Sequence, residues 1–179
     1  MKKVKILDKE FAVSITREEI NNAILTMADR LNEDLKDEDV TFLGILNGSF
    51  MFASDLFKKI NFPCRISFLK LASYQGSSSS GTVKQLIGLN ENLKDKTVVI
   101  LEDIVDTGIT LETIIKQLSG YEPKSIKIAT FLFKPEAYKK DFDLDYVGME
   151  IPNDFIVGYG LDYNGYGRNM EAIYTVVEE

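Results

Sequence analysis

The chain has 179 residues, of which 45% are hydrophobic and 27% charged, a length and composition typical of one globular domain with a substantial core. Its formal net charge of −7 disfavours nucleic acid as the main partner, because nucleic-acid binding requires a basic face. No histidine occurs, which excludes Ser-His and Cys-His catalysis and leaves acid–base chemistry to carboxylates, Lys, Tyr or Cys; a metal site would need oxygen ligands, which favours Mg²⁺.

The one cysteine, Cys64, excludes an intramolecular disulfide and suits a reducing compartment. Its neighbours Phe62, Pro63 and Ile66 are apolar, so we expect a small buried hydrophobe rather than a nucleophile. The first residues, MKKVKILDKEFAV, lack a long apolar stretch, and no run of the sequence approaches the length of a membrane span. We therefore expect a cytoplasmic protein with no membrane partner.

The first third of the sequence predicts a helix, a strand and a second helix. Residues 16–19 (Thr-Arg-Glu-Glu) match a capping box, and apolar side chains then recur at helical spacing as far as Leu31. A buried strand is predicted over Thr41–Leu46 and a helix over Phe50–Ile60. Between these two elements lies the short polar segment Asn47-Gly48-Ser49.

The sequence next predicts a hairpin-like arm. Arg65–Leu71 is typical of a strand, and Val83–Leu89 is typical of its return strand. Between them, Ser73–Thr82 (SYQGSSSSGT) is rich in Ser and Gly and poor in apolar side chains, so it cannot pack into a core. As a plain linker this segment would need no further explanation.

The centre of the chain combines an apolar run with an acidic end. The strand predicted at Val98–Leu101 ends at two adjacent carboxylates, Glu102 and Asp103. The tight loop Asp106-Thr107-Gly108-Ile109-Thr110 follows, and a helix then begins, with apolar residues Leu111, Ile114, Ile115 and Leu118 on one face. Backbone N–H groups converge at such a helix N-terminus and bind anions. Because the carboxylates would repel a bare phosphate, a sugar phosphate with a free diol fits both halves.

The last third predicts four strands: Ser125–Phe133, Tyr146–Ile151, Phe155–Leu161 and, after a polar loop, Ala172–Val177. Strands that alternate with helices favour a single-domain α/β fold, with a twisted, mainly parallel sheet flanked by helices.

Polar residues follow several of the predicted strands. They are Asn47-Gly48, Glu102-Asp103, Lys134 and Asp162. Because ligands of open parallel sheets bind beyond the carboxyl ends of the strands, these residues predict one common site.

Two blocks of the sequence resemble a known family. VILEDIVDTGIT resembles the phosphoribosyl pyrophosphate signature of type I phosphoribosyltransferases, and GMEIPNDFIVGYGLDYNGYGRN resembles its 6-oxopurine branch, the hypoxanthine-guanine phosphoribosyltransferases. The resemblance spans nearly the whole chain. It implies one phosphoribosyltransferase domain over residues 1–179, with a flexible β-arm and a small C-terminal hood that binds the purine. It also implies Mg²⁺-dependent purine salvage, which gives IMP or GMP and pyrophosphate, and a homodimer or homotetramer.

The resemblance and the chemistry of the residues together assign the sugar site. Glu102 and Asp103 would accept hydrogen bonds from the ribose hydroxyls, directly or through Mg²⁺, and the following loop would cradle the 5′-phosphate. The loop residues are Asp106, Thr107, Gly108, Ile109 and Thr110. By resemblance, Asp106 would also act as general base near purine N7. The alternative is that Asp106 and Thr110 are only turn and N-cap residues.

By the same resemblance, Lys134 would donate to the purine O6, Phe155 would stack on the base and Ile156 would offer its backbone; the alternative for Phe155 and Ile156 is strand core. Asp162 would hold Mg²⁺ beside the base and pyrophosphate, and Arg168 would contact pyrophosphate oxygens. A plain Asp162–Arg168 ion pair is the alternative. The metal ligands expected are Glu102, Asp103 and Asp162.

The expected pyrophosphate loop departs from the family pattern, whereas the expected lid matches it. Asn47-Gly48 stands where many members have Lys-Gly, so a positive side chain is missing, and backbone amides, by resemblance next to a cis peptide, would bind instead. Lys70 could supply the charge, because Ala72 replaces a lysine of some members. Ser73-Tyr74 match the start of a loop that closes over the site, which makes residues 73–82 the expected lid.

Two rival functions remain open at this stage. One is a regulatory, ligand-sensing protein that kept the phosphoribosyl site and lost catalysis. The other is a transferase for a different base, such as xanthine or a pyrimidine. Lys134 and Phe155 disfavour pyrimidines, and no residue settles the group at purine C2.

Overall fold

The structure is a computed structural model that describes residues 3–74 and 83–177. The main body is a six-stranded sheet in the order β5-β4-β3-β6-β7-β8, in which only β5 runs antiparallel to its neighbour. Its strands are β3 (Val40–Leu46), β4 (Arg65–Tyr74), β5 (Val83–Ile87), β6 (Thr97–Val105), β7 (Ser125–Phe133) and β8 (Tyr146–Glu150). The predicted α/β fold with a mainly parallel sheet is confirmed.

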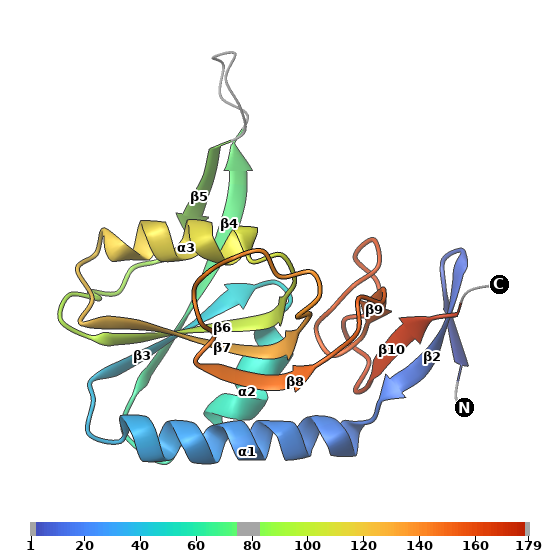
Figure 1. The fold of residues 1–179 in the computed structure, drawn as a ribbon, viewed down its shortest axis with the longest axis horizontal. Coiled ribbons are helices and arrows are strands. Elements are labelled where there is room, and N and C mark those ends of the chain that lie inside the picture. The colour runs from blue at the N-terminus through green and yellow to red at the C-terminus, as the bar shows by residue number, and fades with distance from the viewer. Residues whose placement is uncertain (1–2, 75–82, 178–179) are drawn as a thin grey trace.

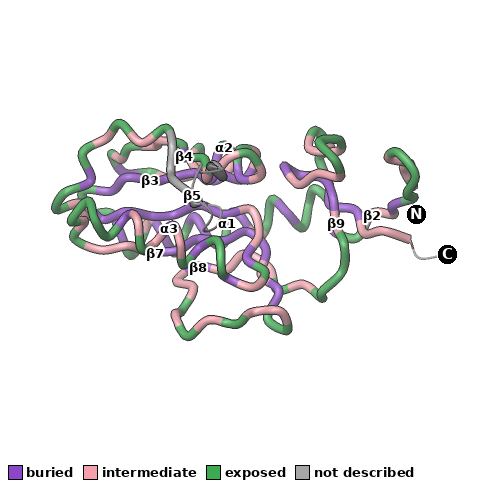
Figure 2. The backbone as a smooth tube through the Cα atoms, turned by 90° about the horizontal axis from the view of Figure 1, so that it is seen from above, coloured by how far each residue is buried: buried purple, intermediate pink, exposed green. Residues whose placement is uncertain are grey.

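Helices cover both faces of this sheet (Figure 1). They are α1 (Arg17–Leu35), α2 (Phe50–Phe57) and α3 (Ile109–Ser119). Side chains of β6 alternate between two cores, because successive strand residues point to opposite faces. Val99 and Leu101 pack in the core with α1 and α2, whereas Val98 and Ile100 pack in the core with α3. Figure 2 shows these central strands as mostly buried backbone, with exposed loops around them.

The first helix begins as the sequence predicts. The Thr16 hydroxyl accepts from the Glu19 backbone N–H at 3.3 Å, and the Glu19 carboxylate accepts from the Thr16 N–H at 2.8 Å. This capping box satisfies N–H groups that a helix start leaves without partners.

A second, smaller sheet lies beside the main body, and we call it the hood sheet (Figures 1 and 2). Its order is β1-β2-β10-β9, all antiparallel. Its strands are β1 (Lys3–Ile6), β2 (Lys9–Ile15), β9 (Ile156–Val157) and β10 (Ile173–Val176). The hood sheet thus joins both ends of the chain. The sequence analysis did not predict β1 and β2, although apolar residues alternate with polar ones at Val4, Ile6, Phe11 and Val13.

Several predicted boundaries are wrong. The strand predicted over Phe155–Leu161 is only the two-residue β9, because Gly158, Tyr159 and Gly160 all have positive φ angles of 100°, 47° and 98°. β6 continues through the carboxylate pair to Val105 instead of ending before it. The second helix ends at Phe57 instead of Ile60.

Three other expectations from the sequence concern Cys64, membrane-spanning helices and the lid. Cys64 is only partly buried against the core, less than expected, and this burial raises the pKa of its thiol, which disfavours a thiolate nucleophile. Within the described ranges, no helix is long and apolar enough to cross a membrane. Of the expected lid, residues 75–82 lie outside the described residues, and Ser73 and Tyr74 are the last residues of β4.

Candidate functional site

The candidate site lies at the carboxyl ends of the parallel strands. β3 ends at Leu46, and the peptide bond from Leu46 to Asn47 is cis, as the resemblance implies. A cavity of about 380 Å³ opens at this edge. It is lined by Ile45, Leu46, Gly48, Leu71, Glu102, Asp103, Ile104 and Thr110. The structure therefore brings residues of β3, β4, β6 and α3 to one cavity. Asn47, Lys134 and Asp162, which the sequence predicts at the same site, are not among the residues that line this cavity.

In the Asp106–Thr110 loop, residues 106–108 join the end of β6 to α3. Ile109 and Thr110, which the sequence predicts before the helix, are the first two residues of α3. Gly108 is the N-cap residue with a φ of 78°, so its backbone adopts a conformation that favours glycine. Gly108 has no side chain to cap this helix end, and the Thr107 hydroxyl accepts from the Ile109 N–H at 3.5 Å. Because this hydrogen bond is long, the first N–H groups of the helix remain suited to an anion. A second cavity of about 100 Å³ lies directly at this loop, lined by Glu102, Ile104, Val105, Asp106, Thr107, Gly108, Thr110 and Leu111.

A segment after β7 supports the loop from outside. A Cβ atom added to Gly108 would lie 2.7 Å from the ring of Tyr138 and 2.8 Å from the Lys140 side chain. The Lys139 N–H donates to the Thr107 carbonyl at 3.3 Å. The Lys140 ammonium pairs with Glu112, in the first turn of α3, at 2.6 Å. The sequence analysis missed these residues, because nothing in their local pattern marks a contact with the loop.

The two adjacent carboxylates serve different parts of the site. Glu102 is only 7% exposed and lines both cavities. Burial, and then repulsion from Asp103, raise the pKa of Glu102 well above its ordinary value. Burial also raises the pKa of Asp103 to about 6, although backbone hydrogen bonds and the charge of Arg168 oppose this rise. One buried and one partly buried acid with raised pKa values form a site that gains from a cation or from hydroxyl donors.

Asp103 is in direct contact with the loop after β3. A Cβ atom on Gly48 would overlap the Asp103 carboxylate, so a larger residue there would force that carboxylate to move. A Cβ atom on Gly160 would in turn overlap the Gly48 carbonyl. We call this stack of Asp103, Gly48 and Gly160 the glycine contact. It joins β6, the loop after β3 and the segment after β9.

Arg168 is tied to the same region. Its guanidinium donates to the Gly160 carbonyl at 2.6 Å and pairs with Asp162 at 2.7 Å, while its own carbonyl accepts from the Gly160 N–H at 3.0 Å. The second carboxylate oxygen of Asp162 accepts from the Gly165 N–H at 2.6 Å. The ion pair that the sequence analysis weighed as an alternative is therefore present. It brings Asp162 and Arg168 close enough to affect the pKa of Asp103.

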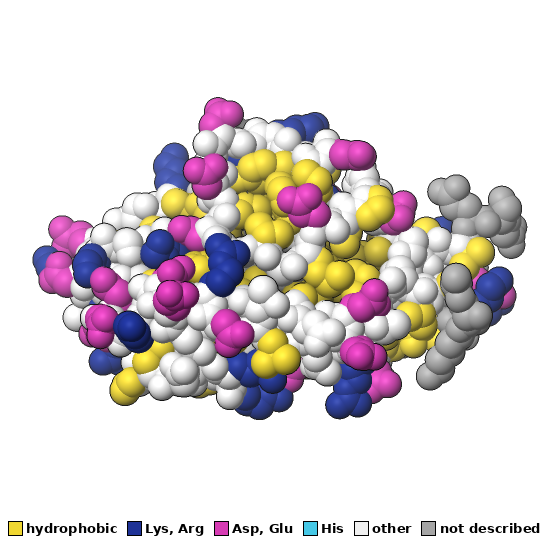
Figure 3. Space-filling view, turned by 60° about the horizontal axis from the view of Figure 1, so that its bottom comes forward, with side chains coloured by type: hydrophobic (Ala, Val, Ile, Leu, Met, Phe, Trp, Pro, Cys, Tyr) yellow, Lys and Arg dark blue, Asp and Glu magenta, His cyan; other side chains and the backbone are white. Residues whose placement is uncertain are grey.

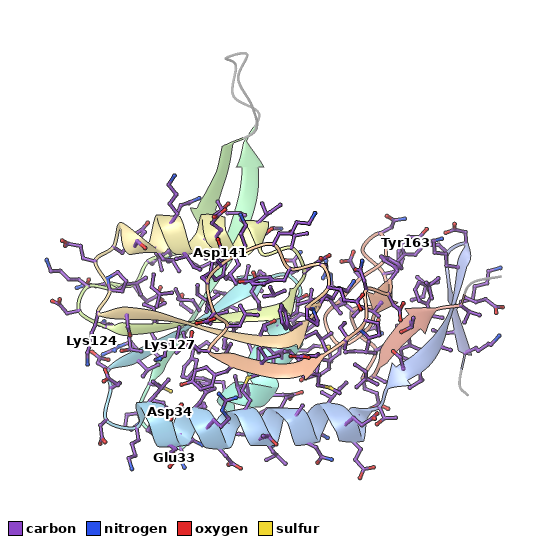
Figure 4. All side chains as sticks on the ribbon, in the orientation of Figure 1. Glu33, Asp34, Lys124, Lys127, Asp141 and Tyr163 are labelled. Atoms are coloured by element: carbon purple, nitrogen blue, oxygen red, sulfur yellow. The ribbon has the colours of Figure 1, made fainter. Side chains whose placement is uncertain are left out.

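The expected base-binding residues lie between the main sheet and the hood sheet. Lys134 follows β7 and is only 8% exposed, and its ammonium donates to the Asp154 carbonyl at 2.8 Å. Phe155 is 45% exposed, and its ring lies 6.1 Å from that of Phe11 and 5.7 Å from that of Tyr163. An exposed aromatic ring held by two others offers a stacking surface. Figure 4 shows Tyr163 within the hood, and the sequence analysis missed both supporting rings.

The remaining candidates have simple positions. Ile156 is the first residue of β9 and packs partly against the main core, as its alternative of strand core expects. Lys70 is an exposed residue of β4, in register with Leu46 of β3, so it lies beside the residue that precedes Asn47.

The carboxylates of the site determine whether Mg²⁺ could bind there. Within residues 3–74 and 83–177, no group of three carboxylate or thiol side chains is arranged to hold a metal ion. Mg²⁺, however, usually binds through one or two carboxylates and completes its shell with water and substrate oxygens. Glu102, which is buried, and Asp103, which is partly buried, supply two carboxylates of this kind, so the residues present fit Mg²⁺ that is shared with a substrate.

Comparison with known proteins extends these observations. A family model described as "Phosphoribosyl transferase domain" matches residues 15–164. A hypoxanthine-guanine phosphoribosyltransferase of Staphylococcus epidermidis is 41% identical over 168 residues, covering 93% of this chain and 94% of the relative. The crystal structure of a hypoxanthine phosphoribosyltransferase from Staphylococcus aureus aligns with a TM-score of 0.85 at 39% identity, covering 93% of this chain and 91% of that chain. A hypoxanthine-guanine phosphoribosyltransferase from Bacillus anthracis aligns with a TM-score of 0.83 at 32% identity, covering 93% and 97%.

Proposed function

This chain belongs to the phosphoribosyl transferase domain family, and on that premise we propose that it is a purine-salvage enzyme. It transfers the 5-phosphoribosyl group of phosphoribosyl pyrophosphate to N9 of hypoxanthine or guanine, and it releases pyrophosphate with IMP or GMP. The observation that supports this proposal most is that Glu102, Asp103, Gly48 and Thr110 line one cavity at the start of α3. This combination suits a sugar that carries phosphate at one end and hydroxyls in the middle.

The sugar phosphate is held at the Asp106–Thr110 loop. Backbone N–H groups at the start of α3 and the hydroxyls of Thr107 and Thr110 bind the 5′-phosphate. Each charge-assisted hydrogen bond contributes roughly 1.5–3 kcal/mol. Glu102 and Asp103 accept from the ribose hydroxyls, and these two carboxylates are the ligands that we assign to Mg²⁺. The third ligand expected from the sequence, Asp162, forms no three-carboxylate group with them among the described residues and is paired with Arg168. When bound, Mg²⁺ neutralises charge on the leaving pyrophosphate.

The pyrophosphate is bound on the other side of the same cavity. We assign it to the backbone of Asn47 and Gly48, to Lys70 and to Arg168. Asn47 lacks the positive charge of the lysine found in many members, so Arg168 carries most of the charge recognition. Its planar guanidinium suits bidentate contact with phosphate oxygens.

The base is selected by Lys134 and Phe155. The buried ammonium of Lys134 donates to O6 of the purine, and Phe155 stacks on the ring while the backbone of Ile156 meets its edge. A site built to pair with a polar group rejects analogues that lack the group, in favourable cases by about 10⁴-fold. The group at purine C2 is not assigned to any residue.

The reaction exchanges one bond at C1′ for another. The bond from C1′ to the pyrophosphate oxygen breaks, a bond from C1′ to purine N9 forms, and the base loses a proton. Asp106 is the proposed acceptor of that proton near N7, because it lines the same cavity as Glu102 and the chain has no histidine. Such general-base assistance typically contributes about 10²–10⁴-fold.

We also propose the cellular setting. The chain forms one domain over residues 1–179, and it works in the cytoplasm as a homodimer or homotetramer on small molecules alone. The net charge of −7 and the single cysteine support this setting. On the face drawn in Figure 3, acidic and basic side chains are interspersed, with no continuous basic stripe for nucleic acid among the side chains drawn.

The test is a steady-state assay with phosphoribosyl pyrophosphate, Mg²⁺ and, in separate reactions, hypoxanthine, guanine, xanthine, adenine and uracil. We expect nucleotide formation with hypoxanthine or guanine, and the assay then ranks the preferences at C2. If folded protein binds the sugar phosphate but converts no base, the proposal fails and a regulatory, ligand-sensing role replaces it.

A further inference from the structure

Tyr159 occupies an unusual position for a tyrosine. Its φ angle is 47°, and it lies between two glycines that also have positive φ. For a residue other than glycine this backbone conformation costs conformational free energy. The side chain is 4% exposed, and its ring packs against Phe131 at 5.3 Å between centroids. The surrounding structure therefore holds Tyr159 firmly in a conformation that its own backbone disfavours.

The phenol of Tyr159 connects this segment to α2. Its hydroxyl donates to the Asp55 carboxylate at 2.8 Å, and Asp55 also pairs with Lys58 at 2.6 Å. Burial and the Asp55 charge raise the pKa of Tyr159, so the phenol remains a donor at neutral pH. Asp55 lies on α2, the helix that begins directly after Asn47-Gly48. The hydrogen bond thus joins the segment after β9 to the element that follows the pyrophosphate loop.

The neighbour of Tyr159 is the residue that completes the glycine contact. Gly160 packs so closely against the Gly48 carbonyl, and Gly48 against the Asp103 carboxylate, that neither glycine leaves room for a Cβ atom. The Gly160 backbone also exchanges hydrogen bonds with Arg168 through both its N–H and its carbonyl. Whatever fixes Gly160 therefore fixes the loop after β3 and Arg168 together.

We propose that Tyr159 is a positioning residue for pyrophosphate: its hydrogen bond to Asp55 holds Gly160 against Gly48 and so sets the Asn47-Gly48 loop and the Arg168 guanidinium. The proposal rests on the proposed function, since it names the side of the site that Tyr159 controls. Tyr159 touches no substrate itself. In the part of the chain that the structure describes, its hydrogen bonds go to Asp55 and Met170 and its ring packs on Phe131, all outside the Asp106–Thr110 loop. Loss of the hydrogen bond should therefore weaken pyrophosphate binding and leave nucleotide phosphate binding unchanged.

The chain offers a matched control for this test. Tyr146 is also buried, at 2% exposed, and its hydroxyl donates to the Asp34 carboxylate at 2.9 Å. Asp34 lies near the end of α1 that is remote from the hood, as Figure 4 shows. Tyr146→Phe and Tyr159→Phe each remove one buried tyrosine–aspartate hydrogen bond, and only Tyr159→Phe removes it beside the glycine contact.

The experiment measures pyrophosphate and IMP binding by calorimetry in the presence of Mg²⁺, together with the melting temperature of each variant. We expect Tyr159→Phe to raise the Kd for pyrophosphate by about tenfold or more, the size of a lost hydrogen bond to a charged group, with the Kd for IMP unchanged. The two variants should lower the melting temperature by similar amounts, because each loses one tyrosine–aspartate hydrogen bond. Tyr146→Phe should leave the Kd for pyrophosphate and the Kd for IMP unchanged.

A second pair of variants keeps the test decisive if Tyr159→Phe fails to fold. Asp55→Asn retains an acceptor oxygen for the phenol, whereas Asp55→Ala removes it, so only Asp55→Ala should weaken pyrophosphate binding. Equal Kd values for pyrophosphate in the paired variants would overturn the positioning role while the wild-type enzyme stays active. If the wild-type protein binds no pyrophosphate and converts no base, the proposed function fails, and this inference fails with it.

Discussion

The two sides of the cavity are built in different ways. The Asp106–Thr110 loop is one continuous stretch that follows β6 and includes the first two residues of α3. The glycine contact instead brings together Asp103, Gly48 and Gly160 from three separate segments. The first side is built from adjacent residues and is supported from outside by the segment after β7, whereas the second side exists only through the tertiary packing of three segments. A continuous loop can bind an anion with few outside contacts, whereas an assembled contact fails if any one of its segments moves.

The largest effect is expected on the continuous side, at the proposed base. Asp106→Asn keeps the shape of the side chain and removes its ability to accept a proton. We expect turnover to fall by about 10²–10⁴-fold, with little change in the KM for phosphoribosyl pyrophosphate. Steady-state kinetics in both substrates provides the measurement. Near-normal turnover would remove Asp106 from the catalytic role.

The next effect concerns base selection between the two sheets. Lys134→Ala removes the donor assigned to O6, so use of hypoxanthine should fall by about 10²-fold or more relative to adenine. The ratio of kcat/KM for the two bases gives the answer. Lys139→Ala, an exposed lysine of the segment next to the loop, is the control and should leave that ratio unchanged. An equal loss for every base would contradict the assignment.

A third prediction tests the assembled side directly. Gly160→Ala adds a Cβ that meets the Gly48 carbonyl, a backbone atom that cannot rotate away. Gly165→Ala is the matched control, because Gly165 also has a positive φ, 88°, but nothing lies within 4 Å of its Cβ position. Both variants share the backbone strain. Gly160→Ala should therefore lose about 1–3 kcal/mol more unfolding free energy than Gly165→Ala, and it should bind pyrophosphate more weakly.

Denaturant unfolding and pyrophosphate calorimetry of this pair separate contact from strain. Equal unfolding free energies in the two glycine variants would mean that the segment after β9 is free to shift away from Gly48. In that case the two sides of the cavity would not differ as described.

The smallest effect is a pH dependence at Asp103. The unfolded chain releases this proton near the ordinary pKa of 3.8, whereas the folded chain keeps it until about pH 6. The folded state thus binds more protons, and stability from this group is full below 3.8 and is lost as the pH rises through about 6. Asp103→Asn should raise the unfolding free energy above that range, by on the order of 1–3 kcal/mol.

The measurement is urea unfolding of wild type and Asp103→Asn between pH 4 and 8, with the exposed Glu33→Gln as control. A stability difference that does not grow with pH would contradict the burial argument. Because Mg²⁺ needs the carboxylates ionised, its binding should also weaken as the pH falls below about 6.

The sequence predicted what is local. Glu102 to Thr110 follow one another in the chain, so their proximity needed no tertiary information, and the capping box at Thr16 and Glu19 is a local hydrogen-bond pattern. Lys134 came from the rule that polar residues after parallel strands meet at one edge, and it does follow the parallel strand β7. The same rule was wrong for Asp162, because β9 ends at Val157 and belongs to the antiparallel hood sheet. The resemblance supplied their roles, which remain proposals.

What could not be predicted depends on distant contacts. Nothing in the sequence near Gly48 or Gly160 indicates that they touch, because that contact depends on how the hood sheet docks. The hydrogen bond from Tyr159 to Asp55 joins residues that lie far apart in the chain. The pattern Gly158-Tyr159-Gly160 did carry a signal against a continuous strand, since glycines on both sides of one residue permit positive φ.

A crystal structure of the protein with IMP, pyrophosphate and Mg²⁺ would show directly whether the two sides of the cavity bind the nucleotide phosphate and the pyrophosphate separately. We expect the 5′-phosphate to accept hydrogen bonds from backbone N–H groups of residues 106–110. We also expect pyrophosphate to lie against Asn47, Gly48 and Arg168, with Gly160 still in contact with Gly48. A nucleotide phosphate bound at Arg168, or pyrophosphate bound away from the Asn47-Gly48 loop, would contradict this expectation.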